Sequence, residues 1–501
     1  MNLRYIYVTG CIVCASLWGM GRASAQTAKK YPVQALREDF NVMRSALEKI
    51  HPSLYWYTPK DSMDRYFDEG YRRIDHEMTE REFFRLILPV LVRVKCGHTY
   101  PDMSDAYRDS QTEPKVYLPF ELFLDGDRLF IVKNGSTDTT LRQGDEILKL
   151  GGTPVAEIAR LARALQTADG DNVAWKNKFV EWFYLQEVYL EYYDGKPPFK
   201  LVVAGKNGTV RETEVRSAKQ MTQPVKPAPR LSRREELRQE RREEALRMAE
   251  QLRFRFTQGD SSAAVIRVGG FSYESIYGRS FYKLHRDIFR AVAERRTENL
   301  VIDLRGNSGG NLAIAEDLMA YLVDRPFRVA DRNELHTPYL AEWESIRPYF
   351  EKQGPGRGFP ARLLKRTGED TYTFPFTRRS DLAPARRYRF SGNVYVITDG
   401  WVFSAGSLFV SSLRAQRKIT VIGGETGGAA VGCSGGRISR LILPNTQLRV
   451  YFPHFRIYAV GRAEADGHGV IPDYPVKHLL TDEVQNRDPE MEQTFHLIKG
   501  R

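Results

Sequence analysis

Short apolar runs alternate with amphipathic stretches between about residue 258 and residue 480, and this alternation restricts the fold of the chain more than any other feature. The apolar runs predict strands at Ala263–Val268, Leu300–Leu304, Asn393–Thr398 and Ile419–Ile422. The stretches between them predict helices at Tyr277–Arg295, Leu312–Val323 and Ala405–Arg414. Strands that alternate with helices form a sheet with helices packed on it. We therefore predict an α/β domain over residues 258–480, followed by a C-terminal tail over residues 481–501.

A small helical domain is predicted over residues 26–115. Apolar residues recur at spacings of three and four from Leu36 to Ile50, as on the buried face of one helix. A capping box formed by Thr79 and Glu82 predicts the start of a second helix. This helix leads into the segment Cys96–Thr99, which contains the sequence Gly-His-Thr.

The segment 116–220 changes to a hydrophobic period of two and is predicted to be rich in strands. Strands are expected at Leu118–Leu124 and Arg128–Lys133, separated by an Asp-Gly turn. The stretch Leu141–Val155 resembles the part of a PDZ domain in which a Gly-Asp pair turns into a strand, so we predict a divergent PDZ-like domain. Such domains bind extended chains at a sheet edge. The alternative is a β-rich spacer.

Residues 221–257 are predicted to be a linker followed by a charged helix. Three prolines lie within residues 221–230, as in an extended linker. The stretch Ser232–Arg253 is dominated by Arg and Glu and has too few apolar residues for a buried face. We expect a solvated helix, and a helix that binds a partner is the alternative.

The first 25 residues predict a signal peptide. Arg4 gives a positive start, Val8–Met20 is apolar, and Ala23–Ala25 offers the small residues of a cleavage site. Lipid anchoring at Cys11 or Cys14 is the alternative, although neither lies in a convincing lipobox. No other run approaches the ~18 apolar residues of a membrane span. The sequence therefore predicts export to the periplasm or cell envelope, without an integral membrane segment after cleavage.

Charge and cysteine content exclude several classes of function. The formal net charge is +12, but no basic segment is interleaved with aromatic residues, so we predict no nucleic-acid partner. Only Cys96 and Cys433 remain after cleavage of the signal peptide, and no His-Glu-x-x-His pattern occurs. We therefore predict neither a metal nor another cofactor.

Ser404 is the first candidate for chemistry. It follows a predicted strand and directly precedes a predicted helix, which exposes its hydroxyl at the sheet edge beside the positive end of the helix. The alternative is that Ser404 only caps this helix. A glycine-rich turn over Asp303–Asn311 also joins a predicted strand to a helix. It lacks the order of a P-loop, and its N–H groups suit a carbonyl oxyanion as well as a phosphate.

Four segments occur in the order found in C-terminal processing, or tail-specific, peptidases. They are Asp303–Gly310, Phe403–Ala405, Gly424–Gly427 and Gly469–Asp473. The Gly-His-Thr segment and the PDZ-like region resemble other parts of the same family. This resemblance implies a serine endopeptidase with a ClpP/crotonase-like α/β core, acting on a protein or peptide substrate.

The resemblance also implies which residue acts as general base. One branch of the family uses a lysine about 25 residues after the serine, where this chain has Ala429, and no lysine occurs between Ser404 and Lys418 or again before Lys477. The tricorn-like branch uses the histidine of the Gly-His-Thr motif, here His98. That branch often has an aspartate where this chain has Cys96. A free histidine has a pKa near 6.5, so we expect kcat/KM to rise with a midpoint near pH 6 to 7.

Further site residues follow from the same resemblance. An acidic residue before Gly469 orients the histidine, and we expect Asp466 in this role, with Glu464 as the alternative. The oxyanion donors are expected to be the backbone N–H groups of Gly309 or Gly310 and of Ala405.

Two alternatives to a peptidase remain open. One is an inactive relative that binds a peptide or hydrophobic ligand, and the other is an enzyme that hydrolyses a non-peptide ester or wall component.

The two remaining cysteines predict a disulfide. If His98 meets Ser404, Cys96 and Cys433 are brought close together, and an oxidising compartment would let them bond. Two free, buried thiols are the alternative.

Overall fold

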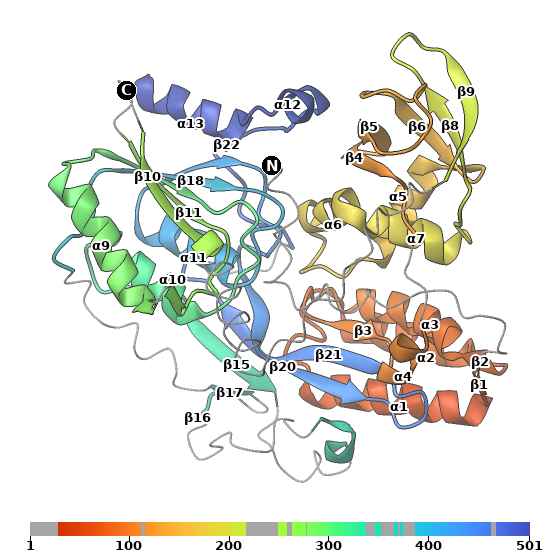
Figure 1. The fold of residues 1–501 in the computed structure, drawn as a ribbon. Coiled ribbons are helices and arrows are strands. Elements are labelled where there is room, and N and C mark those ends of the chain that lie inside the picture. Colours follow the sequence, from red (N-terminus) through yellow and green to blue (C-terminus); the bar gives the residue numbers. More distant parts are fainter. Residues whose placement is uncertain are drawn as a thin grey trace, which may run out of the picture.

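A computed structural model describes most of the chain (Figure 1). The described residues are 29–111, 116–216, 249–257, 263–276, 278–336, 346–351, 365–368, 371–373, 386–461 and 467–500. The predicted signal peptide and most of the predicted linker and charged helix lie outside these ranges.

A twisted sheet forms the centre of the C-terminal half, and its strands run in the order β10-β11-β14-β18-β19-β22. The strands are β10 (Leu252–Phe256), β11 (Ala263–Val268), β14 (Asn299–Asp303), β18 (Asn393–Thr398), β19 (Thr420–Gly423) and β22 (Tyr474–Pro475). All neighbours pair in parallel except β10, which is antiparallel to β11. The predicted α/β fold is confirmed.

Helices cover both faces of this sheet. On one face lie α9 (Phe281–Glu294), α10 (Leu312–Met319) and α11 (Ala405–Gln416). Their apolar residues share one core with Ile266, Ile302 and Val396 of the strands. On the other face α13 (Pro489–Lys499) packs Met491 and Ile498 against Val265 and Val301. The predicted tail over 481–501 is therefore largely helical, with α12 (Leu480–Gln485) before α13.

Short strands occupy two places where the sequence analysis predicted helix. Leu252–Phe256, at the end of the predicted linker and charged-helix segment 221–257, is an edge strand, because Leu252, Phe254 and Phe256 alternate with arginines and face the core. Helix α9 starts at Phe281 instead of Tyr277, because β12 (Ser275–Ile276) and β13 (Arg279–Ser280) form a small hairpin ahead of it.

The N-terminal unit is helical, as predicted. It contains β1 (Lys30–Tyr31), α1 (Val33–Ile50), α2 (Lys60–Arg72), β2 (Met78–Thr79), α3 (Glu80–Val92), β3 (Tyr100–Asp102) and α4 (Asp105–Ser110). The capping box is confirmed, because Glu82 N–H donates to Thr79 and the Glu82 side chain accepts from Thr79 N–H. Leu36, Phe40 and Met43 are fully buried on the predicted face of α1.

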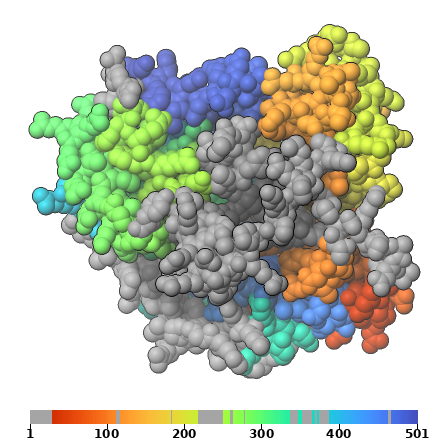
Figure 2. Space-filling view, viewed as in Figure 1, coloured from red at the N-terminus to blue at the C-terminus, as the bar shows by residue number. Residues whose placement is uncertain are grey.

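The middle unit combines a sheet with three helical segments. The sheet contains β4 (Phe120–Asp125), β5 (Arg128–Asn134), β6 (Glu146–Leu150), β7 (Thr153–Pro154), β8 (Phe199–Ala204) and β9 (Val210–Val215). The helical segments are α5 (Val155–Leu165), α6 (Val173–Phe179) and α7 (Leu185–Tyr192), with a π-turn at Val180–Tyr184. Figure 2 shows this unit beside the C-terminal helices, where Lys477 Nζ lies 2.7 Å from Asp125 Oδ1.

A long hairpin joins the C-terminal α/β half of the fold to the N-terminal unit, and the sequence analysis did not predict it. Its strands are β20 (Gly432–Ile442) and β21 (Arg449–Tyr458), and the remaining elements near it are β15 (Arg332–His336), a 3₁₀ turn (Arg347–Tyr349), β16 (Lys365–Arg366) and β17 (Thr371–Thr373). Figure 1 shows the hairpin reaching from the α/β core to α1. Strand β21 pairs with β3.

The buried carboxylate of Asp39 fixes the tip of this hairpin. It accepts hydrogen bonds from the backbone N–H groups of Asn445 and Thr446, each at 2.8 Å. Because β3 begins two residues after His98, the pairing of β3 with β21 fixes the histidine segment relative to the core. Among the described helices, none has the length and apolarity needed to cross a membrane.

Candidate active site

Ser404 lies between β18 and α11 in an unusual backbone conformation. Its φ is +52° and its ψ is −122°, a region that a residue with a side chain enters at a cost of about 1–3 kcal/mol. Its hydroxyl makes no hydrogen bond to the first turn of α11, so Ser404 does not act as a side-chain cap. The side chain is partly exposed, whereas its neighbours Phe403 and Ala405 are buried. The strained turn thus presents a hydroxyl at the positive end of a helix.

The predicted glycine-rich turn lies directly against Ser404. A Cβ placed on Gly309, whose φ is +106°, would lie 2.8 Å from Ser404 Cβ and 3.0 Å from the Ala405 nitrogen. The Gly309 N–H donates to Asn307 Oδ1 at 2.9 Å, so it is already engaged. Within the described residues, the N–H groups of Gly310 and Ala405 make no hydrogen bond. Of the predicted set, these two amides are the ones not already engaged in a hydrogen bond.

Replacing Gly309 by alanine should damage both stability and activity. The new Cβ would meet Ser404 and Ala405 at non-bonded distances that real contacts rarely reach, in addition to a backbone strain of about 1–3 kcal/mol. We expect a lower thermal midpoint and a loss of about 100-fold or more in kcat/KM. The matched control is Gly126→Ala, which also has positive φ but nothing within 4 Å of the new Cβ. That variant should lose some stability and keep its activity, and equal activity loss in both would contradict the assignment.

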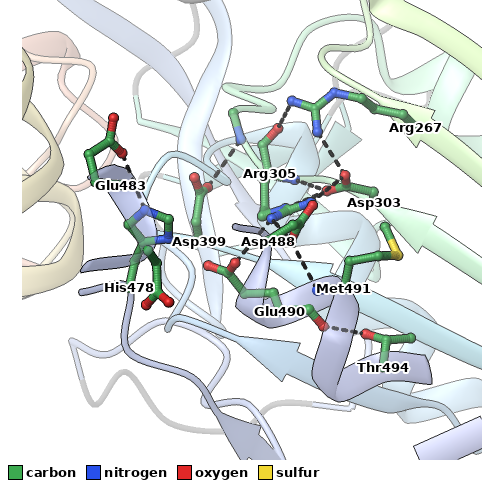
Figure 3. A network of polar contacts seen from close by, with 12 residues as sticks. Arg267, Asp303, Arg305, Asp399, His478, Glu483, Asp488, Glu490, Met491 and Thr494 are labelled. Carbon is green, nitrogen blue, oxygen red and sulfur yellow. Dashed lines mark hydrogen bonds and ion pairs between the residues drawn. The ribbon is translucent and has the colours of Figure 1, made fainter. Parts of the chain in front are cut away.

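Charged residues behind the turn hold it in place (Figure 3). Arg305 bridges Asp303, Asp488 and Glu490, at 2.9, 2.7 and 3.1 Å. Arg267 lies 2.7 Å from Asp303 as well, and the arginines beside it lower the pKa of that carboxyl despite its burial. This network links the turn to the start of α13, and its residues position the backbone instead of facing Ser404.

His98 lies in the turn after α3 and rests on the residue that precedes the serine. Its ring centroid is 4.7 Å from that of Phe403, which in turn stacks on Trp175 at 4.2 Å. His98 and Ser404 make no direct hydrogen bond in this structure, and catalytic hydrogen bonds often tighten only when substrate binds. The ring is partly exposed, but its Nδ1 atom is buried and has no hydrogen-bond partner.

Burial changes the ionisation expected for His98. It lowers the imidazole pKa from 6.5 to about 4, so the ring is neutral and able to accept a proton at neutral pH. The sequence analysis expected kcat/KM to rise with a midpoint near pH 6 to 7 from deprotonation of His98. The buried position of the ring instead moves its deprotonation to a lower pH.

Asp169 is a buried carboxylate at this site that the sequence analysis missed. It lies in the loop between α5 and α6, and its Oδ1 accepts a hydrogen bond from Gly97 N–H at 2.9 Å. Its other oxygen, Oδ2, is buried without a partner. Burial raises the pKa of this carboxyl to about 7. The only sequence signal is a polar turn, Asp169–Asn172, between two amphipathic helices, and nothing in it points to residue 97.

Cys96 and Cys433 are both free and buried, so the predicted disulfide is absent from the structure. The thiols lie close enough for Cys96 to raise the pKa of Cys433. Each is engaged elsewhere, however: Cys96 with the hydroxyls of Thr99 and Ser434, and Cys433 with that of Ser404. The geometry therefore corresponds to the alternative, two buried thiols.

Cys96, His98 and Asp169 also offer a thiol, an imidazole and a carboxylate, with the potential ligand atoms within 4.8 Å of one another. This limit is wider than the roughly 3.3–3.8 Å between ligand atoms that share one tetrahedral zinc ion, so the grouping alone does not define a metal site. We assign no metal to this cluster.

The two remaining predicted segments support the site from the side. Thr426 accepts a hydrogen bond from Val470 N–H at 2.7 Å, and Glu425 accepts one from Gly469 N–H at 2.7 Å. Ala429, where the lysine branch would place its base, is buried, and its backbone N–H donates to Asp169. The predicted acidic residues Asp466 and Glu464 lie outside the described residues.

Comparisons with known proteins agree with this geometry. The model of peptidase family S41 matches residues 262–476. The Tricorn protease of Thermoplasma volcanium is 26% identical over 173 residues, which cover 33% of this chain and 16% of that protein. The chain thus matches only a small part of its curated relative.

Solved structures share the fold over nearly the whole chain. Mature CPAF complexed with lactacystin superimposes with a TM-score of 0.61 at 14% identity, over 93% of this chain and 98% of that chain. Mature CPAF alone gives a TM-score of 0.59 at 14% identity, over 93% and 96% of the two chains. The resemblance to tail-specific and tricorn-like peptidases is confirmed by these matches, with residues 262–476 corresponding to the domain of peptidase family S41.

Proposed function

We propose that this protein is a serine endopeptidase in which Ser404 is the nucleophile and His98 the general base. The observation that carries the proposal is the strained backbone of Ser404, whose hydroxyl does not cap α11. Ser404 lies against Gly309 of the glycine-rich turn and directly follows Phe403, the ring that His98 contacts. A side chain is held in such a conformation at a cost, and such strain is typical of functional sites.

The geometry suits acyl transfer. Ser404 Oγ attacks the carbonyl carbon of the scissile peptide bond while its proton passes to the neutral imidazole of His98. The N–H groups of Gly310 and Ala405 donate to the oxyanion that forms. The imidazolium then returns the proton to the leaving amine as the C–N bond breaks. Water repeats the sequence on the ester and releases the acid.

Space beside the nucleophile favours a polypeptide substrate. Gly435 of β20 has no side chain, and a Cβ there would stand 3.9 Å from Ser404 Oγ. The backbone of the β20 residue next to Ser404 is thus not shielded from the hydroxyl by a side chain of its own, and we place the extended substrate chain on this side of the nucleophile. The middle unit, with its sheet edge, is proposed to act as a PDZ-like binding unit for such a chain.

Two further parts of the sequence prediction belong to this proposal. Asp466, or Glu464 in its place, is proposed to orient His98. The first 25 residues are proposed to direct export to the periplasm or cell envelope.

Purified protein without residues 1–25 should cleave an unfolded protein such as reduced, alkylated casein. The expected result is a set of new termini, identified by mass spectrometry, that appears at a steady rate and stops after treatment with a fluorophosphonate. An inactive relative would bind the same chain without creating termini. Hydrolysis of a small ester without cleavage of any polypeptide would instead favour the non-peptide alternative.

A further inference from the structure

The loop that carries Asp169 is hydrogen-bonded to two residues that directly precede His98, Lys95 and Gly97. Asp169 Oδ1 accepts from Gly97 N–H at 2.9 Å, and Gly170 N–H donates to the carbonyl oxygen of Lys95 at 3.0 Å. Two hydrogen bonds from one loop thus span the residues that precede the histidine. This arrangement fixes the carboxylate of Asp169 relative to the His98 backbone.

Two polar atoms at this point lack partners. Asp169 Oδ2 and His98 Nδ1 are both buried and make no hydrogen bond, and a carboxylate oxygen of Asp169 lies within 4.8 Å of a ring nitrogen of His98. One atom is an acceptor, and the other becomes a donor when the proton of the neutral ring is on Nδ1. Because buried polar groups are rarely left unpaired, each of these atoms is the natural partner of the other.

No other group near Asp169 is placed to compensate a negative charge on its buried carboxylate, among the residues that the structure describes. The ionisable groups coupled to it are the thiols of Cys96 and Cys433, which are neutral at ordinary pH because burial raises their pKa. The nearest lysine in sequence on the histidine turn, Lys95, pairs with Asp171 at 2.7 Å. Within the described residues, no cation pairs with Asp169. The imidazole is the one group here whose charge changes during the proposed reaction.

We propose that Asp169 is a positioning residue for His98, whose Nδ1–H it accepts through Oδ2 when the site closes on substrate. The inference rests on the proposed function and adds a carboxylate that neither the Gly-His-Thr motif nor the segment before Gly469 contains. The bond directs Nε2 toward Ser404 and stabilises the imidazolium formed when the serine proton moves to His98. Catalytic hydrogen bonds are often long or poorly aligned in the free enzyme and tighten only when substrate binds.

The ionisation of the two groups gives this role a distinct pH dependence. The negative carboxylate is the active form, and burial raises its pKa to about 7. The neutral imidazole is also required, and burial lowers its pKa to about 4. Activity should therefore rise with pH through a midpoint near 7, which reports Asp169, and His98 alone would give a midpoint near 4.

Asp169→Asn separates this role from a structural one. Asparagine keeps a carbonyl oxygen for Gly97 N–H and removes only the charge and the acceptor at Oδ2. We expect kcat/KM at pH 8 to fall by about 100- to 1000-fold, and the remaining activity to lose its midpoint near 7 and rise at a lower pH. The control Asp171→Asn, which loses an exposed partner of Lys95, should keep both the rate and the profile. Asp169→Glu, which keeps the charge, should retain a limb near neutral pH.

The histidine itself gives a readout that does not depend on turnover. In protein with isotopically labelled histidine, the His98 ring signals of the wild type should shift with a midpoint near pH 7 as the neighbouring Asp169 carboxyl loses its proton, and Asp169→Asn should lose this step. The inference would be overturned if Asp169→Asn kept the turnover, the pH profile and the His98 titration of the wild type. The proposed function would then still stand. If the wild type hydrolyses no polypeptide, the proposed function fails, and His98 ring signals of the wild type that show no step near pH 7 would then overturn the inference as well.

Discussion

Replacing Ser404 by alanine should lower kcat/KM for an unfolded protein substrate by about 10⁴-fold or more. The variant lacks the oxygen proposed to form the acyl intermediate, and what would remain is catalysis by the backbone amides and by substrate binding. Alanine occupies the same backbone conformation as serine, and the Ser404 hydroxyl does not cap α11, so the fold should be little affected. The measurement is the rate of appearance of new termini, with circular dichroism to follow the melting of both proteins.

Ser407→Ala is the matched control for this variant. Ser407 lies on the same helix, and its hydroxyl donates to the Val402 carbonyl oxygen at 2.8 Å. Its loss should cost about 1 kcal/mol of stability, as expected for one hydrogen bond, and leave turnover within a few-fold of the wild type. If Ser404→Ala retained turnover while Ser407→Ala lost it, the nucleophile would be assigned to the wrong serine.

Replacing His98 by glutamine should lower kcat/KM by about 10³-fold or more. Glutamine is similar in size and remains polar, but it cannot accept the serine proton at neutral pH. The effect should appear mainly in kcat, because the ring contacts Phe403, directly beside the proposed nucleophile, and the substitution removes a proton acceptor. Single-turnover measurements above pH 7 would show the loss directly, since the buried ring is already neutral there.

A histidine outside the site provides the comparison. His76 is exposed and pairs with Asp75 in the N-terminal unit, so His76→Gln should retain full activity. Retained turnover in His98→Gln would show that another group takes the proton, and the tricorn-like assignment of the base would be wrong.

Local patterns were sufficient for most of the core. The bounds of β11 and β18 are those predicted, and α11 begins at Ala405 as the strand–serine–helix pattern indicated. The capping box at Thr79 also forms. In each case the signal lies within a few residues of the element, either in hydrophobic periodicity or in capping chemistry. The motif residues Ser404 and Gly309 meet because both follow neighbouring parallel strands of one sheet.

The rest depends on contacts between distant segments. The β20–β21 hairpin was missed, and its role in fixing His98 comes from pairing Arg449–Tyr451 with Tyr100–Asp102. Asp169 belongs to a different unit from both His98 and Ser404, and only the packed structure shows its carboxylate on Gly97 N–H. The cysteine prediction placed the two thiols near each other correctly but could not show that each is engaged by a hydroxyl.

The most direct test of the central claim is the site of covalent labelling by a fluorophosphonate. After reaction with the probe and digestion, mass spectrometry should locate one adduct on the peptide that contains Ser404. Labelling should be absent in Ser404→Ala, strongly slowed in His98→Gln and unchanged in Ser407→Ala. An unlabelled wild-type protein, or an adduct on another residue that persists in Ser404→Ala, would contradict the account.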